Sequence, residues 1–542
     1  MLGLMQDWPL LISKILNHAE RHHGRREVVT MTVEGPIHRY TYADMAVRAR
    51  KLAQALHRLG IGVGDRVGSI AWNTYRHVEL WFATSGSGAV MHTVNPRLFP
   101  EQIAYIVNHA EDRVLFVDLT FVPLVEKMID HFQGVDAFVI MTDEAHMPET
   151  SLTNALCYET LVAAEDGAYS WPRLDENTAA GLCYTSGTTG NPKGVLYSHR
   201  STVLHCFATL CTDTLAIRAT DATLPIVPMF HANAWGVPYA AAAAGAKLAL
   251  NGPNHEPEPL HALIEDEGVT VTAAVPTIWL GMLDYLGKTG KRLDCLQRVT
   301  IGGAAAPRTM IEMFQKVYGV EVSHAWGMTE LNPLGTVGSP NAYSAALDED
   351  GQLDLKCKQG RAVFGVEMKI VDDDDVELPW DGVAFGRLKV RGPWVAGEYF
   401  KHEGGAILDD AGWFDTGDVS TIDEHGFMQI TDRSKDVIKS GGEWISSIDL
   451  ENAAVGHPDV AEAAVIGIHH PKWDERPLLI VVPQDGRTVD KQVMTEFLTG
   501  KVAKWWLPDD VVTVSEIPHT ATGKIQKTTL REQFKDYKLP TY

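Results

Sequence analysis

Strand-like and helical patterns alternate from residue 42 to residue 301, and this alternation limits the fold more than any other feature of the chain. Apolar residues recur at helical spacing over residues 42–59, Gly60 and Gly62 end that helix, and a strand-like run follows at 66–72. Strands that alternate with helices are typical of βαβ units and a parallel sheet. Further helices are predicted at 77–87, 100–110, 201–215, 235–244 and 260–267, and strands at 89–94, 114–117, 137–142, 180–184, 223–228, 247–250, 269–275 and 298–301.

We assign these elements to two α/β layers. The first layer ends near residues 137–142, and the irregular segment 143–177 separates it from a second layer that opens with the strand at 180–184. Ligands of doubly wound sheets bind where the carboxyl ends of the strands open outward. Two such sheets that share a face would therefore enclose a cleft.

The pattern changes after about residue 360. Short strands and turns at 366–371, 386–390 and 412–418 favour a small antiparallel, barrel-like piece over another βαβ layer. A new α+β pattern begins after residue 434. We predict an α/β fold with a small distorted β-barrel, in which a large N-terminal domain (1–434) precedes a small mobile α+β lid domain (435–542).

The composition is that of a globular protein with an excess of acidic residues. Hydrophobic residues make up 45% and charged residues 22% of the 542 residues, and 47 basic against 70 acidic side chains give a formal net charge of −23. This charge argues against non-specific binding of nucleic acid or anionic lipid. An anionic substrate would have to meet a local cluster of lysine and arginine.

The spacing of the cysteines and the N-terminal sequence are typical of a protein in the reducing environment of the cytoplasm. The six cysteines lie scattered without a Cys-x-x-Cys pair, which favours free thiols in a reducing environment. No signal-peptide pattern precedes the first helix, and no run approaches the ~18 apolar residues that a membrane span requires. We therefore expect a cytoplasmic protein without membrane insertion.

The loop at 184–194 has the composition of a phosphate-binding segment. It reads Tyr-Thr-Ser-Gly-Thr-Thr-Gly-Asn-Pro-Lys-Gly. Glycines let backbone N–H groups converge on an anion, hydroxyls add neutral donors, and Lys193 adds a positive charge. The loop lacks the Gly-Lys-Ser/Thr ending of the usual nucleotide triphosphatase loop, because Pro192 precedes Lys193. An ordinary polar linker with a surface lysine is the alternative.

Seven motifs in a fixed order resemble the adenylate-forming superfamily, which includes acyl-CoA synthetases, adenylation domains of peptide synthetases and firefly luciferase. The resemblance extends from about residue 41 to residue 527. The motifs lie at 184–194, 228–236, 302–307, 324–330, 413–418, 431–443 and 519–527. It implies activation of a carboxylate by attack on the α-phosphate of ATP, giving an acyl-adenylate and pyrophosphate.

The resemblance also implies the ATP site and the catalytic residues. Lys524, Glu330 and His231 are the predicted catalytic residues, and Glu330 with Thr185 would bind Mg²⁺. A helix-start carboxylate at Glu330 and an exposed tail lysine at Lys524 are the simpler alternatives. The implied ATP- or AMP-binding residues are Thr185, Ser186, Gly187, Thr188, Thr189, Gly190, Lys193, Gly303, Ala304, Ala305, His324, Ala325, Trp326, Gly327, Met328, Thr329, Asp418 and Arg433.

The implied acceptor is coenzyme A. A rotation about Lys435, the hinge position of the family, would withdraw Lys524 and bring a pantetheine tunnel to the site, and homodimers are expected by the same resemblance. The tunnel residues would be Lys439, Ser440, Gly441 and Gly442. No carrier-protein segment follows in this sequence, which favours coenzyme A over a carrier-bound thiol.

The acyl pocket indicates an apolar acid. Peptide-synthetase domains place an aspartate after the phenylalanine of the second motif, whereas this chain has His231, which leaves an α-amine without a counter-ion. The expected pocket residues are His231, Ala234, Trp235, Trp279, Gly302, Pro307 and Trp326, although Trp279 could equally belong to the core.

The substrate expected first is 3-(methylthio)propionate, followed by a medium-chain fatty acid. Residues 230–253, 468–477 and 503–508 are similar to the medium- and long-chain fatty acyl-CoA ligases, a branch that includes the 3-(methylthio)propionyl-CoA ligases. A luciferase-like oxygenase and a non-catalytic nucleotide-binding protein are the alternatives from other classes.

Overall fold

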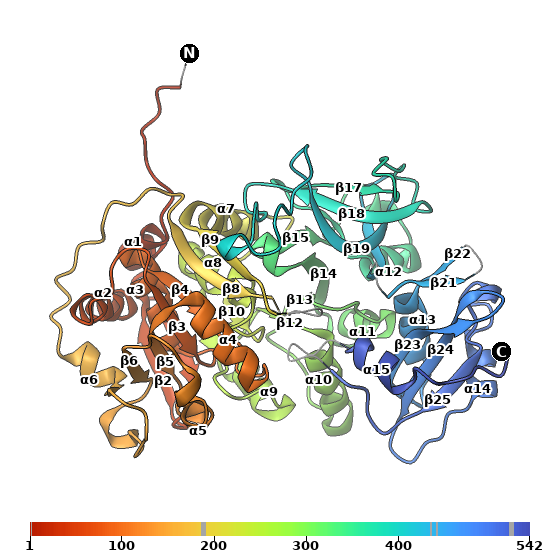
Figure 1. The fold of residues 1–542 in the computed structure, drawn as a ribbon, viewed down its shortest axis with the longest axis horizontal. Coiled ribbons are helices and arrows are strands. Elements are labelled where there is room, and N and C mark those ends of the chain that lie inside the picture. Colours follow the sequence, from red (N-terminus) through yellow and green to blue (C-terminus); the bar gives the residue numbers. More distant parts are fainter. Residues whose placement is uncertain (2, 186–190, 434–435, 441–442, 520–524, 542) are drawn as a thin grey trace.

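The computed structural model describes the chain except for residues 2, 186–190, 434–435, 441–442, 520–524 and 542 (Figure 1). Its first two thirds form two large mixed sheets. The seven-stranded sheet has the order β7 (Ala155–Cys157), β6 (Ala137–Ile140), β5 (Asp112–Val117), β3 (Arg66–Ile70), β4 (Val90–Thr93), β8 (Ala179–Tyr184) and β9 (Gly194–Ser198). The nine-stranded sheet has the order β16 (Arg361–Ala362), β15 (Leu334–Val337), β14 (Glu321–Gly327), β13 (Arg298–Ile301), β12 (Val271–Ala274), β10 (Ala222–Pro225), β11 (Lys247–Leu250), β1 (Glu27–Met31) and β2 (Ile37–Thr41).

One expected sheet assignment is wrong. Strand β8, which we expected to open the second layer, pairs in parallel with β4 (Met91 opposite Gly181) and so belongs to the first sheet. Strand β1, near the N-terminus, instead pairs with β11 of the second sheet. A local pattern shows that a segment is a strand but not which neighbour it joins, because pairing depends on contacts between distant residues.

A local capping signal sets the start of helix α2 (Tyr42–Arg58). Thr41 accepts a hydrogen bond from the backbone N–H of Asp44, whose side chain bonds back, so that the predicted helix over 42–59 is confirmed as a helix that starts at Tyr42. The helices of the large domain are α1 (Ile12–His23), α2 (Tyr42–Arg58), α3 (Tyr75–Ser87), α4 (Pro100–Ala110), α5 (Val122–Glu126), α6 (Tyr158–Ala163), α7 (His199–Leu210), α8 (Val237–Ala244), α9 (Pro257–Asp266), α10 (Pro276–Thr289), α11 (Arg308–Glu312) and α12 (Glu349–Cys357).

The two large sheets share one hydrophobic core. Side chains of α1, α2, α3 and α8 pack there with Val67 and Phe116 of the seven-stranded sheet and with Leu248 and Leu250 of the nine-stranded sheet. The shared helix layer holds the two sheets at a fixed relation, so that the ends of their strands can line one site.

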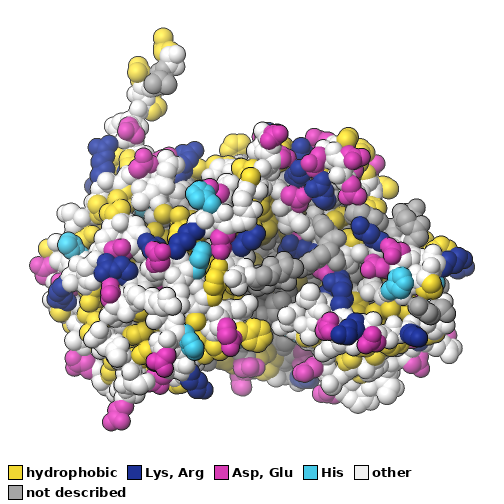
Figure 2. Space-filling model, viewed as in Figure 1, with side chains coloured by type: hydrophobic (Ala, Val, Ile, Leu, Met, Phe, Trp, Pro, Cys, Tyr) yellow, Lys and Arg dark blue, Asp and Glu magenta, His cyan; other side chains and the backbone are white. Residues whose placement is uncertain are grey.

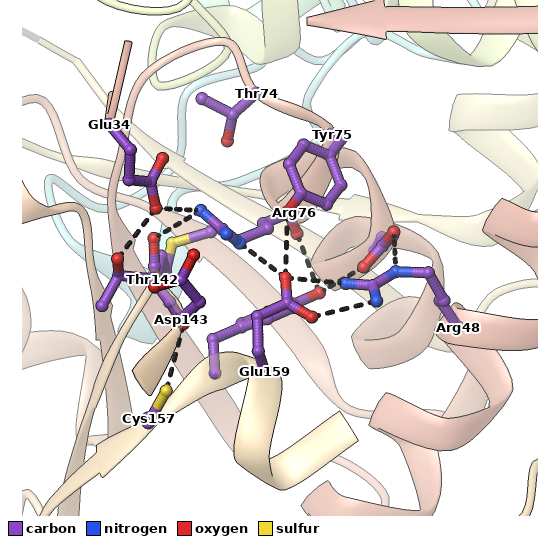
Figure 3. A network of polar contacts seen from close by, with 12 residues as sticks. Glu34, Arg48, Thr74, Tyr75, Arg76, Thr142, Asp143, Cys157 and Glu159 are labelled. Carbon is purple, nitrogen blue, oxygen red and sulfur yellow. Dashed lines mark hydrogen bonds and ion pairs between the residues drawn. The ribbon is translucent and has the colours of Figure 1, made fainter. Parts of the chain in front are cut away.

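A buried ionic network adds polar links between these parts (Figure 3). Arg76 of α3 pairs with Glu34, in the turn between β1 and β2, at 2.7 Å and with Glu159 of α6 at 2.8 Å. Arg48 of α2 pairs with Glu79 of α3 at 2.7 Å and with Glu159 at 3.0 Å. The network connects the edge hairpin of one sheet to helices that cover the other.

The expected barrel-like piece is a four-stranded antiparallel sheet, and its described strands form no closed barrel. Its order is β17 (Glu367–Val371), β18 (Phe385–Arg391), β19 (Phe414–Ile422) and β20 (Met428–Arg433). The lid carries a five-stranded sheet made of β22 (Glu443–Ile445), β21 (Ile438–Ser440), β24 (Asp474–Pro483), β23 (Val460–His470) and β25 (Asp510–Thr513), with helices α13 (Ser447–Val455), α14 (Lys491–Leu498) and α15 (Lys527–Gln533).

The visible surface mixes both signs of charge. Figure 2 shows acidic and basic side chains interspersed over this face without a large patch of one sign. Among the described residues, no helix is both long and apolar enough to cross a membrane.

Candidate active site

A cavity of about 950 Å³ lies where the two large sheets, the four-stranded sheet and the lid meet. It brings together residues that are far apart in the sequence. The predicted site residues that line it are Thr185, Lys193, His231, Trp235, Gly302, Gly303, Ala325, Trp326, Gly327, Met328, Thr329, Glu330 and Arg433. Ser186, Gly187, Thr188, Thr189, Gly190, Lys435, Gly441, Gly442 and Lys524 lie outside the described residues.

The phosphate loop connects two antiparallel strands, β8 and β9. The backbone N–H of Thr185 donates to the carbonyl of Lys193 at 2.9 Å, and the N–H of Lys193 donates to the hydroxyl of Thr185 at 3.2 Å. These bonds close the base of the loop and leave the Lys193 ammonium group at the cavity, 4.8 Å from the centre of the Tyr399 ring. In the described part of the chain, no carboxylate pairs with Lys193.

Glu330 is a buried carboxylate that faces the same cavity. Its side chain accepts a hydrogen bond of 2.7 Å from the Tyr399 hydroxyl, and its residue is 6% exposed. No basic side chain of the described residues pairs with it. A buried anionic oxygen without a protein cation suits a hard divalent metal, so Glu330 fits the expected Mg²⁺.

The site offers Mg²⁺ few protein ligands. Among the described residues there is no group of three or more histidine, cysteine, aspartate or glutamate side chains that could hold a metal. Mg²⁺ commonly binds through one or two carboxylates together with substrate phosphates and water. Glu330, with Thr185 also lining the cavity, would therefore hold the ion mainly in company with a nucleotide.

Asp418 is held just behind the cavity wall. The Trp326 indole N–H donates to one carboxylate oxygen at 2.9 Å, and the Arg433 guanidinium contacts the other at 2.8 Å. Asp418 and Arg433 lie opposite each other on β19 and β20, which explains why their pairing is fixed by the sheet. Gly417 rather than Asp418 lines the cavity directly.

Two glycines that follow β13, Gly302 and Gly303, line the cavity. A Cβ atom on Gly302 would lie 2.9 Å from the Ala325 carbonyl and 3.0 Å from the Trp235 ring, and Gly303 has a φ of +84°. Ala304 and Ala305 follow without lining the cavity. His324 lies behind this strip, where its ring nitrogens contact the carbonyls of Cys357 at 3.0 Å and Ala304 at 3.4 Å. Burial lowers the pKa of His324, which favours a neutral ring.

Trp235 reaches the cavity from an unusual turn. Residues 232–235 all have positive φ values between 43° and 54°, followed by Gly236 at 72°. This backbone region disfavours residues with a Cβ, so the turn must be held by its surroundings. The side-chain oxygen of Asn233 accepts hydrogen bonds from the Cys183 thiol at 3.3 Å and the Thr93 hydroxyl at 3.4 Å, within the buried core.

Three expected pocket residues do not line the cavity. Trp279 is fully buried and packs edge-on against Phe314, with ring centres 5.3 Å apart. Successive side chains of a helix point about 100° apart, so Thr277 and Ile278 of α10 face the cavity while Trp279 faces the core. Ala234 is buried in the core between the sheets, and Pro307 precedes helix α11.

Several residues that line the cavity were not among the predicted site residues. Arg97, Phe230 and His255 line the cavity, with the Arg97 guanidinium 5.8 Å from the Phe230 ring. Tyr399 also lines it, from an irregular loop. Phe230 stands in the motif at 228–236, directly before His231, whereas Arg97, His255 and Tyr399 lie outside all seven motifs. Tyr399 stands beside Phe400 in the stretch 392–405, where no spacing marks it as a site residue.

One side of the lid faces the cavity. His519 and Gln526, which flank the segment containing Lys524, line it together with Lys527 at the start of α15. His519 pairs with Glu462 at 2.6 Å, and Lys527 pairs with Glu451 at 2.8 Å. The expected tunnel residues Lys439 and Ser440 belong to β21 and do not line the cavity in this arrangement; Figure 1 places the β21–β22 hairpin and α15 on different sides of the lid.

Known proteins resemble this chain over nearly its whole length. The family model "AMP-binding enzyme" matches residues 16–400, and the model "AMP-binding enzyme C-terminal domain" matches residues 449–524. A 3-methylmercaptopropionyl-CoA ligase of Ruegeria lacuscaerulensis is 52% identical over 536 residues, covering 99% of both chains. A medium-chain-fatty-acid–CoA ligase of Ectopseudomonas oleovorans is 49% identical over 536 residues, covering 99% of this chain and 98% of that protein.

Solved structures share the fold. The crystal structure of the anthranilate CoA ligase AuaEII in complex with anthranoyl-AMP superimposes with a TM-score of 0.87 at 24% identity, covering 98% of this chain and 99% of that one.

Proposed function

Since the chain belongs to the AMP-binding enzyme family, we propose that it is an AMP-forming acyl-CoA ligase that joins a carboxylic acid to coenzyme A at the cost of ATP. The observation that supports this proposal most is the single cavity where the phosphate-loop residues Thr185 and Lys193, the buried carboxylate Glu330 and the glycine strip at Gly302 meet the lid.

In the first half-reaction, a carboxylate oxygen attacks the α-phosphorus of ATP, and the bond to pyrophosphate breaks. Lys193 and Thr185 would hold the leaving phosphates, and Lys524 would hold the reacting carboxylate and α-phosphate. Mg²⁺ bound at Glu330 would neutralise charge on the phosphate oxygens. Asp418, already oriented by Trp326 and Arg433, would accept hydrogen bonds from the ribose hydroxyls.

In the second half-reaction, the sulfur of coenzyme A attacks the acyl carbonyl, the thiol proton is lost, and AMP leaves. Lys439 to Gly442 would form the tunnel for the pantetheine arm after the lid rotates. His519 and Gln526, which flank the segment containing Lys524 in the sequence, line the cavity, and this suits the first half-reaction.

We propose 3-(methylthio)propionate as the preferred acid and a medium-chain fatty acid as the second candidate. Trp235, Phe230 and Ile278 give the cavity apolar walls. Trp235 closes against Gly302, which favours a short or medium acyl chain. Relatives at 52% and 49% identity carry the names of ligases for these two substrates.

Rates of AMP formation with coenzyme A and four acids would test the proposal: 3-(methylthio)propionate, butyrate, octanoate and palmitate. The highest kcat/KM is expected for 3-(methylthio)propionate. The highest value for palmitate would overturn the substrate order, and no ATP consumption with any acid would favour a non-catalytic nucleotide-binding protein. Light emission with a luciferin would reveal a luciferase-like oxygenase.

We also propose how the chain divides into domains and how it assembles. We divide the chain into an N-terminal adenylation domain (1–434) and a lid (435–542), and we propose a cytoplasmic homodimer. Sedimentation equilibrium of the purified protein would distinguish a dimer from a monomer.

A further inference from the structure

We propose that Tyr399 is a positioning residue that keeps the Lys193 ammonium group and the Glu330 carboxylate apart and correctly oriented, each ready for its own part of the magnesium–nucleotide complex. This inference rests on the proposed function, which gives Lys193 to the phosphates and Glu330 to the metal.

Tyr399 contacts both groups through different parts of its side chain. Its hydroxyl donates to Glu330 at 2.7 Å, and its ring faces the Lys193 ammonium nitrogen at 4.8 Å from the ring centre. A phenol hydroxyl donates a hydrogen bond, and that of Tyr399 is directed at the Glu330 carboxylate. One neutral side chain therefore offers a partner to a cation and to an anion.

The physical need for such a residue follows from the charges. A lysine and a carboxylate that line one cavity attract each other. A direct ion pair would neutralise both groups before the nucleotide arrives. Among the described residues no ion pair joins Lys193 to any carboxylate, and the face of an aromatic ring satisfies a cation without neutralising its charge.

The loop around Tyr399 is braced against the same two residues. The backbone N–H of Ala396 donates to the carbonyl of Glu330 at 2.7 Å. Gly404, with a φ of +80°, lies so close to Lys193 that a Cβ there would be 2.8 Å from the ammonium nitrogen. Tyr105 of α4 donates to Glu403 at 2.8 Å and ties the loop to the first sheet. The contacts of Ala396 with Glu330 and of Gly404 with Lys193 place the loop beside both charges.

Two substitutions separate the two contacts. Tyr399→Phe removes the hydroxyl and keeps the ring, whereas Tyr399→Leu removes both. Binding of the non-hydrolysable analogue α,β-methylene-ATP is measured by titration calorimetry, once with EDTA and once with saturating Mg²⁺.

Loss of a group that orients a metal ligand commonly weakens metal binding about 10–100-fold. Tyr399→Phe should therefore weaken binding of the Mg²⁺ complex at least about 10-fold, while metal-free binding stays within about 2-fold of the native value. Tyr399→Leu should also weaken metal-free binding, by about 2–5-fold.

The matched control is Tyr105→Phe, which removes the hydroxyl that donates to Glu403 of the same loop and leaves Glu330 untouched. This variant should bind the Mg²⁺ complex like the native protein. Equal losses with and without Mg²⁺ in Tyr399→Phe, or the same loss in Tyr105→Phe, would trace the effect to loop placement and overturn the inference. Glu330→Gln tests the metal role of Glu330 separately. If this variant loses the Mg²⁺ effect while Tyr399→Phe binds normally, only the role of Tyr399 fails. If Glu330→Gln also keeps its Mg²⁺ dependence, the metal role of Glu330 fails as well.

Discussion

Charged side chains at the cavity differ in whether the protein itself neutralises them. Arg433 pairs with Asp418, and Lys527 pairs with Glu451. Lys193 and Arg97 have no carboxylate partner among the residues that the structure describes. In a protein with a net charge of −23, cations at a cavity that no carboxylate neutralises are the groups that an anionic ligand can use.

Replacing Lys193 by alanine should therefore impair ATP use. A hydrogen bond to a charged group contributes about 1.5–3 kcal/mol, so we expect Lys193→Ala to slow ATP–pyrophosphate exchange by about 10–100-fold, with a much smaller effect on thioester formation from preformed acyl-adenylate. Equal losses in both half-reactions of Lys193→Ala would contradict its assignment to the leaving phosphates.

Lys524→Ala should slow the exchange by about 10²–10³-fold, because the variant lacks a donor to the transition state.

Asp118 provides a pH-dependent prediction away from the reacting groups. It is 1% exposed and accepts a hydrogen bond from the backbone N–H of Trp72 at 2.7 Å. Burial raises its pKa from 3.8 to about 7, although the charge of Arg76 opposes the shift. The folded protein therefore keeps a proton that the unfolded chain loses above pH ~4, so this contribution to stability is full at low pH and is lost as the pH rises through 7. Asp118→Asn has no such proton to lose.

The midpoint temperature of thermal unfolding of Asp118→Asn is expected to rise relative to that of the native protein as the pH increases. Thermal unfolding of both proteins at pH 5 and pH 8 checks this. A difference between the two proteins that is the same at both pH values would show that Asp118 does not titrate in this range.

Helices α2, α3 and α6 are joined by ion pairs between side chains as well as by apolar contacts. Arg48 and Arg76 share Glu159, and Glu34 completes the link to the edge hairpin β1–β2 (Figure 3). Buried pairs of this kind are sensitive to removal of one partner, because the remaining charge stays in a medium of low polarity.

Arg76→Met should destabilise the large domain by about 3–5 kcal/mol, because Glu34 and Glu159 would lose their shared cation. Urea unfolding followed by circular dichroism measures this loss. Adding Glu159→Gln to Arg76→Met should recover part of it. As a control, Arg113→Met removes an exposed partner of Asp136 and should cost no more than about 1 kcal/mol; a similar loss in both arginine variants would argue against a special role for the network.

At the scale of the whole molecule, the lid presents one side to the cavity and holds the predicted tunnel elsewhere. His519 and Gln526 line the cavity, whereas Lys439 and Ser440 do not. If one site serves two half-reactions, the lid has to turn between them, and lid motion of this kind can limit turnover.

Fixing the hinge should separate the two half-reactions. Proline locks its own φ and restricts the preceding residue, so Lys435→Pro should leave pyrophosphate exchange near the native rate and slow thioester formation at least about 10-fold. Lys435→Ala, which keeps the backbone free, should affect neither step strongly. Rapid-quench measurement of acyl-adenylate and acyl-CoA distinguishes the steps, and loss of both in Lys435→Pro would count against a hinge at this position.

Local sequence patterns identify most helices and strands and the motif residues at the cavity. Helical spacing placed α2, and the small residues after β13 indicated the strip at Gly302 and Gly303. Such features are local: a cap, a hydrophobic period or a glycine acts on neighbouring residues, so its signal is complete within a short segment.

The tertiary structure decided what depends on distant partners. It placed β8 in the first sheet, turned Trp279 into the core while Ile278 faces the cavity, and brought Tyr399 into contact with both Lys193 and Glu330. Strand neighbours, the facing of a helix and the contacts of a loop side chain are fixed by packing between segments that lie far apart in the chain. No local pattern around Tyr399 carries that information, because its partners are a lysine and a glutamate from two other parts of the fold.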